Sequence, residues 1–348
     1  MSNINLFVVQ SPFQMISAIE AANYFKCENN VLIVRLTGEK NNNNQIERLF
    51  EFFQWTRVIC IRHLLSITVT DNKLAFYLNK IKRNERISYL FIGEIRSRIM
   101  QAYIDNLNYD SCFLLDDGVS TAVTNKILRE NSFDLTKLFK SSRRNYLINK
   151  LLYKLWGISG KKGKLIHWFS CFNIKAIGSE QVFIHRFEYL KGMMESRTVT
   201  KLENVIFFIG SNLSGVGVMD VSNELRLLKL MAKKYSEKGI HVVYCSHRRE
   251  AQEKLDAINA IDNMQIRTMT FPLEIAFMIE GEYPDRIATF YSSALYTLQK
   301  IYAPKYIKSF RIPGNLITDE YKDSVNKAYA YLAEEGVVID NINYDDIR

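Results

Sequence analysis

Short apolar runs alternate with segments of helical period along most of the chain. In the first half, the runs typical of buried strands are Leu6–Gln10, Val31–Leu36, Arg57–Arg62, Tyr89–Ile92 and Cys112–Leu115. Apolar residues at helical spacing lie between several of these runs, at Phe13–Phe25, Ile46–Phe53 and Ile95–Leu107. The Asn41–Asn44 run reads as a polar loop. Strands that alternate with helices predict a mostly parallel sheet covered on both faces.

The second half repeats this scheme after a polar connection at about residues 195–203. Its predicted strands are Asn204–Gly210, His241–Cys245, Gln265–Met269 and Ile287–Phe290, and its predicted helices are Val221–Lys238, Glu250–Ile258 and Ala294–Tyr302. We therefore expect an α/β chain of two Rossmann-like domains, 1–198 and 199–348, with the last helix a candidate to cross back onto the first. In such sheets ligands bind beyond the carboxyl ends of the strands.

Composition narrows the class of protein. With 348 residues, of which 47% are hydrophobic and 12% aromatic, the chain can form two packed cores and is not disordered. Its five cysteines form no CxxC pair or Cys/His cluster, which excludes a disulfide-stapled miniprotein and indicates a reducing cytoplasm. The first residues lack the pattern of a signal peptide, and no stretch of about 18 uncharged apolar residues predicts a membrane-spanning helix.

The first candidate for chemistry is Asp116-Asp117-Gly118, directly after a predicted strand. A carboxylate there can act as a general base if its surroundings raise its pKa, and an adjacent like charge pushes in that direction. The alternative is an ordinary Asp-Gly turn. Two adjacent carboxylates with scattered histidines lack the ligand spacing of a zinc site, so we expect no metal.

Three further candidates follow strands of the second half. His247 and the two arginines after it could hold a phosphate at a helix start, and Ser292 and Ser293 open the next predicted helix. Glu274, in a predicted loop, could accept hydrogen bonds from ribose hydroxyls. The alternatives are a solvated helix start at His247, simple helix capping by Ser292 and Ser293, and an ordinary surface glutamate at Glu274.

The order of these motifs resembles the bacterial sialyltransferases of the capsule and lipooligosaccharide type, including the polysialyltransferase-like group. That group has a D/E-D/E-G motif, then a His-Pro motif, then a Ser-Ser or Ser-Thr motif. The stretches FVVQSPFQ at 7–14 and FIGSNLS at 208–214 also look like it, and the resemblance covers about residues 5–305. One departure is Arg248, which stands where the family motif has proline.

The resemblance implies a GT-B fold with two Rossmann-like domains, an inverting reaction, CMP-sialic acid as the donor substrate, and no metal or other cofactor. Asp116 would be the general base that takes the proton from the acceptor hydroxyl. His247 would hold the CMP phosphate and assist its departure, with Ser292 and Ser293 on the same phosphate and Glu274 on the ribose. Domain closure would then be part of the catalytic cycle.

The same resemblance gives weaker assignments to the loops after the first strand of each half. Ser11 would touch the sialic acid, Gly210 would let the backbone approach the donor, and Ser211 and Asn212 would also contact it. The acceptor would be a hydroxyl of a capsule, O-antigen or lipooligosaccharide glycan. Hydrogen-bond donors fixed on the leaving phosphate stabilise the transition state more than the ground state, which agrees with these roles.

Two other functions stay open. A GT-B enzyme could use another nucleotide sugar, linked to UDP or GDP. A non-catalytic basic protein could bind an anionic surface through its charge, although no RNA-binding fingerprint is present and we expect no nucleic-acid partner. No motif encodes the acceptor, the linkage, the number of sugars added or the oligomeric state.

The net charge of +9 comes from one segment within a basic insert at about residues 125–195. From Leu135 to Ser179 there are ten Lys and Arg and no Asp or Glu, so the rest of the chain carries 9 − 10 = −1. Apolar residues recur at helical spacing between these lysines. The pattern fits peripheral attachment to the inner face of the cytoplasmic membrane, a solvated helix, or attraction of a polyanionic acceptor.

Overall fold

The computed structural model describes residues 3–62, 67–118, 120–130, 154 and 165–342. The chain divides into two compact units, Met1–Tyr189 and Leu190–Arg348, which are described separately. The division lies somewhat before the boundary at 198 and 199 that the sequence predicts. Most of the basic stretch at 135–179 lies outside the described residues; Lys154 and Lys175 within it are exposed.

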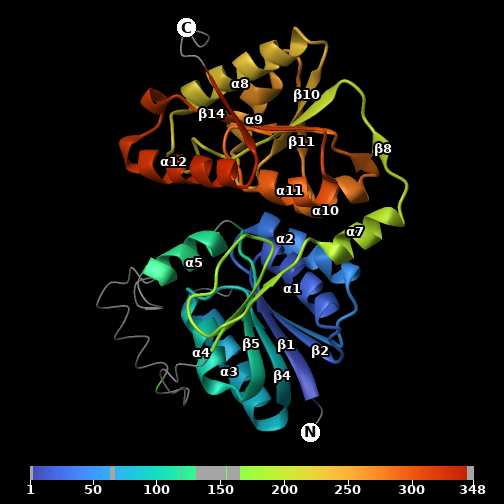
Figure 1. Ribbon diagram of the computed structural model, residues 1–348, viewed down its shortest axis with the longest axis vertical. Helices are drawn as coiled ribbons and strands as arrows, with labels where there is room; N and C mark the ends of the chain where they lie inside the picture. Colours follow the sequence, from blue (N-terminus) through green and yellow to red (C-terminus); the bar gives the residue numbers. More distant parts are fainter. Residues whose placement is uncertain (1–2, 63–66, 119, 131–153, 155–164, 343–348) are drawn as a thin grey trace. The chain divides into compact units, whose positions relative to one another are not determined.

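Unit 1 is built on a parallel sheet with the strand order β3-β2-β1-β4-β5-β6-β7 among its described residues. The strands are β1 (Asn3–Val9), β2 (Asn30–Arg35), β3 (Arg57–Ile61), β4 (Arg86–Ile92), β5 (Tyr109–Leu114), β6 (His167–Ser170) and β7 (Val182–Ile184). The helices are α1 (Pro12–Tyr24), α2 (Lys40–Arg48), the 3-10 turn η1 (Leu49–Phe52), α3 (Ile67–Asn84), α4 (Arg98–Asn106) and α5 (Ser120–Glu130). Helices α1 and α2 lie on one face of the sheet, and α3 and α4 lie on the other (Figure 1).

Local sequence explains most of these elements. Six of the seven β1 residues are buried, as a strand covered on both faces requires. Helix α1 begins with Ser11 as its N-cap, whose Oγ accepts the Gln14 N–H at 3.2 Å, and Pro12 occupies the first turn. The polar loop expected at Asn41–Asn44 is wrong, because these residues lie in α2 and Asn42 is buried with its amide 3.3 Å from the Gln10 carbonyl.

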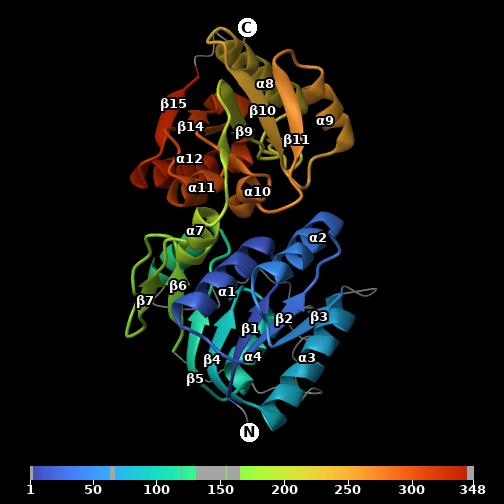
Figure 2. The ribbon, with the colours of Figure 1, turned by 90° about the vertical axis from the view of Figure 1, so that its right-hand side faces the viewer.

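Unit 2 is built on a second parallel sheet, with the order β11-β10-β9-β13-β14-β15, and a two-stranded sheet of β12 and β8. The strands are β8 (Thr200–Lys201), β9 (Val205–Ile209), β10 (His241–Ser246), β11 (Met264–Thr268), β12 (Glu282–Tyr283), β13 (Arg286–Thr289), β14 (Tyr306–Arg311) and β15 (Val338–Asn341). The helices are α7 (Glu188–Glu195), which spans the division between the units, α8 (Val221–Ser236), α9 (Gln252–Asn259), α10 (Leu273–Ile279), α11 (Ala294–Tyr302), the 3-10 turn η3 (Gly314–Leu316) and α12 (Asp319–Glu334). Figure 2 shows α8 and α9 on one side of this sheet and α10 and α11 on the other.

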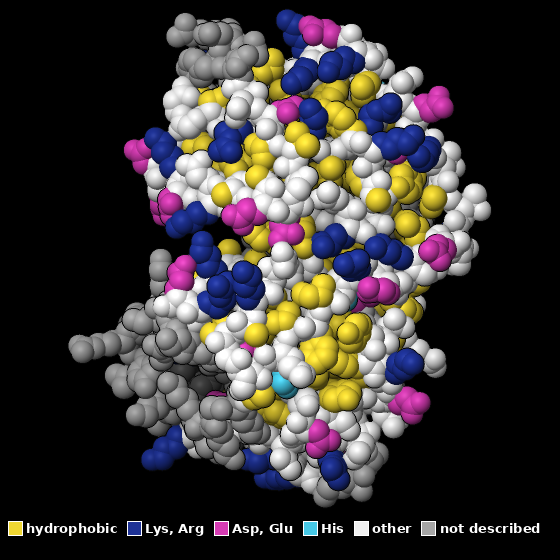
Figure 3. Space-filling view, in the orientation of Figure 1, with side chains coloured by type: hydrophobic (Ala, Val, Ile, Leu, Met, Phe, Trp, Pro, Cys, Tyr) yellow, Lys and Arg dark blue, Asp and Glu magenta, His cyan; other side chains and the backbone are white. Residues whose placement is uncertain are grey.

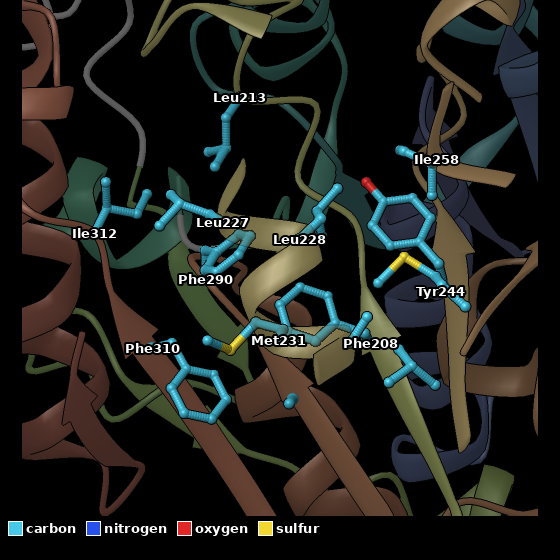
Figure 4. Packing of buried hydrophobic residues seen from close by; sticks show 14 of the residues in the cluster. Phe208, Leu213, Leu227, Leu228, Met231, Tyr244, Ile258, Phe290, Phe310 and Ile312 are labelled. Atoms are coloured by element: carbon cyan, nitrogen blue, oxygen red, sulfur yellow. The ribbon is translucent and has the colours of Figure 1, made fainter. Parts of the chain in front are cut away.

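The core of unit 2 is filled by apolar side chains from β9, β10, β13 and β14 that pack against α8 (Figure 4). Phe208, Leu227, Met231 and Phe310 are at most 1% exposed in this cluster, and Tyr244 lies beside them. Burial of this much apolar surface is the main force that holds the unit together. Helix α12 also belongs to unit 2, where the buried Tyr329 hydroxyl accepts the Ile312 N–H at 3.0 Å. The crossing of the last helix onto the first domain stays a prediction.

Both large sheets share one strand order. Numbered within each large sheet, the first five strands run 3-2-1-4-5, so the order reverses between β1 and β4 and between β9 and β13. Parallel α/β sheets bind ligands beside such reversals, at the carboxyl ends of the strands. No helix in the described part of the chain has the length and apolar character needed to cross a bilayer. Lys and Arg side chains are spread over both units on the face shown in Figure 3.

Candidate functional site

In unit 1, the loops after β1, β4 and β5 and the first turn of α1 bring five polar side chains together. The Asp117 Oδ1 atom accepts a hydrogen bond from the Ser11 hydroxyl at 3.2 Å and another from the Gln14 amide at 2.8 Å. Arg96 donates to both Glu94 oxygens, at 2.8 and 2.7 Å, and its Nη2 is 3.3 Å from Asp117 Oδ2. The carboxylates of Glu94 and Asp117 therefore both contact the same guanidinium nitrogen, Arg96 Nη2, next to the strand reversal.

The two carboxyl groups differ in their pKa. Burial raises the pKa of Asp117, and the negative charge of Glu94 raises it further, while Gln14 and Arg96 act in the opposite direction. Burial also opposes ionisation of Glu94, but hydrogen bonds from Arg96 hold the pKa of Glu94 below its usual value. With 25% of its side chain exposed, Asp117 is the carboxylate in this group that is suited to accept a proton from a substrate.

Asp116 has a different environment. Its side chain is completely buried, its Oδ1 accepts from the Ser170 hydroxyl at 2.5 Å, and its Oδ2 accepts from the Cys171 N–H at 2.6 Å. The Asp116 backbone N–H donates to Ser17 Oγ at 3.1 Å. In this structure Asp116 ties β5 to β6 and cannot reach a substrate hydroxyl. The geometry therefore favours Asp117, the next residue of the same motif, over Asp116 as a general base.

Ligand-type side chains, all buried except the exposed Glu188, also gather around His185. Its Nε2 lies 3.4 Å from Asp116 Oδ2, and it forms two groups that could hold a metal ion, one with Asp116 and Cys171 and one with Glu20 and Glu188. Each group offers three ligand atoms, whereas structural zinc sites use four. Since the carboxylate of Asp116 already accepts two short hydrogen bonds, we assign no metal to this cluster.

In unit 2, all the candidate residues except Glu274 lie at the ends of three neighbouring strands, β10, β9 and β13. Ser211 follows β9, and its hydroxyl is 3.3 Å from that of Thr289 at the end of β13. Asn212 is buried in a left-handed conformation (φ 49°), and its amide reaches the Arg249 carbonyl after β10 at 3.3 Å. The structure thus brings the predicted loops to one edge of the sheet, beside its strand reversal.

His247 is held in a tight turn after β10. Its backbone N–H donates to Glu250 Oε2 at 2.8 Å, and its ring Nδ1 accepts the Arg249 N–H at 3.2 Å. A neutral imidazole that accepts through Nδ1 carries its proton on Nε2. The turn therefore prepares the Nε2–H as a hydrogen-bond donor, although Arg248 replaces the proline of the expected motif.

The paired serines occupy different positions at the start of α11. Ser292 Oγ accepts the Ala294 N–H at 3.2 Å, so this hydroxyl caps the first turn. Ser293 is exposed, and its side chain makes no capping hydrogen bond. The first N–H groups of a helix attract anions, and a second hydroxyl beside them adds a donor.

Glu274 lies in the first turn of α10, not in the loop that the sequence predicts. Its Oε1 accepts from the Thr297 hydroxyl of α11 at 2.8 Å. Burial raises the pKa of Glu274, while Thr297 and the positive charge of Arg248 lower it. The position links α10, α11 and the His247 turn, and it makes Glu274 a buried acceptor with restricted access to a ligand.

Gly210 has a structural reason to be glycine. A Cβ built at this position would lie 2.6 Å from the Tyr244 hydroxyl and 3.0 Å from the Cys245 carbonyl. Any side chain would therefore displace Tyr244. The sequence predicts a close approach of the donor to the backbone at Gly210. In the structure, Tyr244 and Cys245 of β10 lie close to Gly210, and contact with the donor substrate stays a prediction.

Comparison with known proteins identifies the family. A profile described as alpha-2,8-polysialyltransferase matches residues 5–311, nearly the whole chain. The chain belongs to this family. The expected relationship is confirmed, and the protein is a glycosyltransferase of the sialyltransferase class. A search of curated proteins finds no match.

Solved structures show the same fold at low identity. The chain is similar to a UDP-GlcNAc 2-epimerase from Neisseria meningitidis bound to UDP-GlcNAc, with 11% identity, a TM-score of 0.52, and coverage of 97% of this chain and 95% of that one. It is also similar to the UDP-GlcNAc 2-epimerase from Methanocaldococcus jannaschii, with 10% identity, a TM-score of 0.51, and coverage of 99% and 90%. These similarities confirm the predicted GT-B fold of this sialyltransferase.

Sequence reasoning missed Gln14, Glu94 and Arg96. Glu94 follows the predicted strand Tyr89–Ile92 by two residues, so the strand-end rule that selects Asp116 and Asp117 would also have selected Glu94. Gly93 carries a second signal: a Cβ there would lie 2.2 Å from the Gln14 amide oxygen. Glycine at this strand end therefore makes room for the glutamine that binds Asp117.

Proposed function

We propose that this polysialyltransferase-family enzyme transfers sialic acid from CMP-sialic acid to a hydroxyl of a surface glycan, with inversion at the anomeric carbon and without a metal. The family match supports sialyl transfer, and the arrangement of donors at the end of the unit 2 sheet supports a nucleotide monophosphate as the leaving group. Capsule, O-antigen and lipooligosaccharide glycans are the proposed acceptors.

The observation that carries this proposal is the set of donors beside the β9–β13 reversal. His247 presents an Nε2–H, Ser293 an exposed hydroxyl, and α11 its N-terminal N–H groups. As the bond to the sugar breaks, negative charge grows on the leaving phosphate, so donors fixed at that position stabilise the transition state. These groups supply charge stabilisation that other enzymes obtain from a bound cation.

We assign the general base to Asp117. It accepts hydrogen bonds from Ser11 and Gln14, which fix its orientation, and its pKa is raised by burial and by Glu94. A base works best when its pKa approaches the working pH. Ser11 then contacts Asp117 directly, and its proposed contact with the sialic acid would place that sugar beside the base. The originally predicted base, Asp116, supports the loop.

Glu274 is proposed to accept a hydrogen bond from the ribose of CMP. One of its oxygens is taken by Thr297, so the other would serve the nucleotide. Ser211 and Asn212 would contribute to the same donor site from the adjacent loop, while Ser292 stabilises the helix that presents Ser293.

The test is a comparison of donors with the purified full chain. The enzyme is incubated with CMP-sialic acid, small galactosides and sialosides, and excess EDTA. We expect release of CMP, and NMR should show that the sialic acid in the product has the anomeric configuration opposite to that in the donor. Turnover of UDP-GlcNAc or another UDP- or GDP-sugar in place of CMP-sialic acid would contradict the proposal. Loss of activity with EDTA, restored by a divalent cation, would contradict the metal-free mechanism.

A further inference from the structure

Three charged side chains are buried behind the loops that carry the proposed phosphate donors. The Lys254 ammonium of α9 is 2.6 Å from Glu224 Oε1 of α8 and 2.9 Å from Glu250 Oε1. The exposed fractions of these side chains are 5% for Lys254, 2% for Glu224 and 0% for Glu250. Burial of three charges is costly, and hydrophobic residues of similar size often give equal or greater stability. The cluster therefore calls for a reason other than stability.

Each carboxylate of the cluster also binds the backbone of a loop. Glu224 Oε2 accepts the Ser214 N–H at 2.8 Å, in the loop after β9. Glu250 Oε2 accepts the His247 N–H at 2.8 Å, in the turn after β10. Lys254 bridges the two carboxylates, so it couples the loop of Ser211 and Asn212 to the turn of His247.

Tyr244 provides a further hydrogen bond to Glu250. Its hydroxyl donates to Glu250 Oε1 at 2.6 Å, from a fully buried ring in the unit 2 core. Burial and the charge of Glu250 raise the pKa of Tyr244 well above its usual value, so the hydroxyl stays a donor. This hydroxyl occupies the space that a side chain at Gly210 would need. The glycine thus belongs to the same arrangement.

We propose that Glu224, Glu250 and Lys254, with Tyr244, are positioning residues that fix the His247 turn relative to the loop after β9. The inference rests on the proposed role of His247 as a donor to the leaving phosphate. Glu250 holds the backbone nitrogen of His247, and the Arg249 N–H in the same turn fixes the ring through Nδ1. A shift of this turn would move the Nε2–H away from the phosphate, and a misplacement of about 1 Å can lower a rate by about 100-fold.

The test uses Glu250→Gln and the milder Tyr244→Phe, with Tyr329→Phe as the matched control. Tyr329 is also a buried tyrosine of the unit 2 core, and its hydroxyl bonds the backbone at Phe310 and Ile312, which are not part of the His247 turn. With CMP-sialic acid, kcat should fall by about 10- to 100-fold in Glu250→Gln and by about 3- to 10-fold in Tyr244→Phe. Tyr329→Phe should stay within about twofold at a temperature where all variants are folded.

A second readout needs no activity. The ring nitrogens of ¹⁵N-labelled His247, assigned with His247→Ala, should show the Nε2–H tautomer in the wild type and in Tyr329→Phe. In Glu250→Gln and Tyr244→Phe, the signals should shift toward tautomer averaging. Unchanged His247 signals and unchanged kcat in folded Glu250→Gln would overturn the positioning role. Full turnover by His247→Ala would instead contradict the proposed phosphate contact, so the two failures are distinguishable.

Discussion

Substituting Asp116 and Asp117 singly by asparagine tests which of the two aspartates supports the loop and which acts as the general base. In Asp116→Asn, the new side chain keeps one acceptor oxygen and turns an NH2 group toward a buried donor, either the Ser170 hydroxyl or the Cys171 N–H. Each charge-assisted hydrogen bond contributes about 1.5–3 kcal/mol, and one buried donor loses its partner. We therefore expect unfolding free energy to fall by about 3–5 kcal/mol.

That loss is large enough to measure by calorimetry or urea unfolding. For a unit of this size, about 2–4 °C of Tm is lost per kcal/mol, so the unit 1 transition should fall by roughly 6–20 °C. Asp117→Asn removes a carboxylate that is 25% exposed, and its stability should change by no more than about 1 kcal/mol. Its turnover should fall by roughly 10²- to 10⁴-fold, the usual range for a lost general base.

The opposite pattern would refute the reasoning. If Asp116→Asn kept its full Tm but lost turnover, and Asp117→Asn kept turnover, Asp116 would be the base and its burial would be relieved during catalysis. Activity must be compared below the Tm of Asp116→Asn, so that its unfolded fraction does not imitate a catalytic defect. Ser170→Ala, which removes one donor to Asp116, should reproduce part of the stability loss without a large loss of turnover.

Further predictions concern pH, the nucleotide and the basic segment. Because the pKa of Asp117 is raised, activity should be lost as the pH falls through that pKa. Glu94→Gln removes a like charge beside Asp117, so the acid limb of kcat/KM should move to lower pH. An acid limb that does not move would exclude an effect of Glu94 on the pKa of Asp117. His247→Ala should lower turnover by roughly 10²- to 10⁴-fold, and near wild-type transfer would refute its role. Glu274→Ala should weaken CMP binding by about tenfold in calorimetry, whereas unchanged affinity would exclude a ribose contact. The full chain should co-sediment with anionic liposomes at low salt if residues 135–179 bind membranes, and no binding would exclude that use.

The parallel α/β architecture could be predicted from sequence because buried strands and amphipathic helices carry distinct periods. The predicted helix Ala294–Tyr302 agrees with α11, and the five strands expected in the first half all appear. Weak local signals explain the failures. Helix α2 contains the asparagine run, and Asn42 within it makes a buried contact with the Gln10 carbonyl. That contact joins segments far apart in the chain, and no local pattern encodes it.

The candidate site was predictable in outline because parallel strands bring their carboxyl ends to one edge. The loops of Asp116 and Asp117, His247, and Ser292 and Ser293 all lie at such edges, as strand order in an α/β sheet requires. The position of a residue at the carboxyl end of a strand does not predict whether its side chain is accessible. Two adjacent aspartates are equivalent in sequence, yet one is completely buried and the other is partly exposed.

The sequence by itself determined the fold class, the two-domain organisation and the family, because these follow from periodicity and from the order of short motifs. Only the tertiary structure decided which aspartate faces solvent, that Glu94 and Arg96 join Asp117, and that Lys254 couples two loops through Glu224 and Glu250. The physical reason is that burial, pKa shifts and ion pairing arise from contacts between residues remote in the chain. Such contacts are set by the packing of the whole unit.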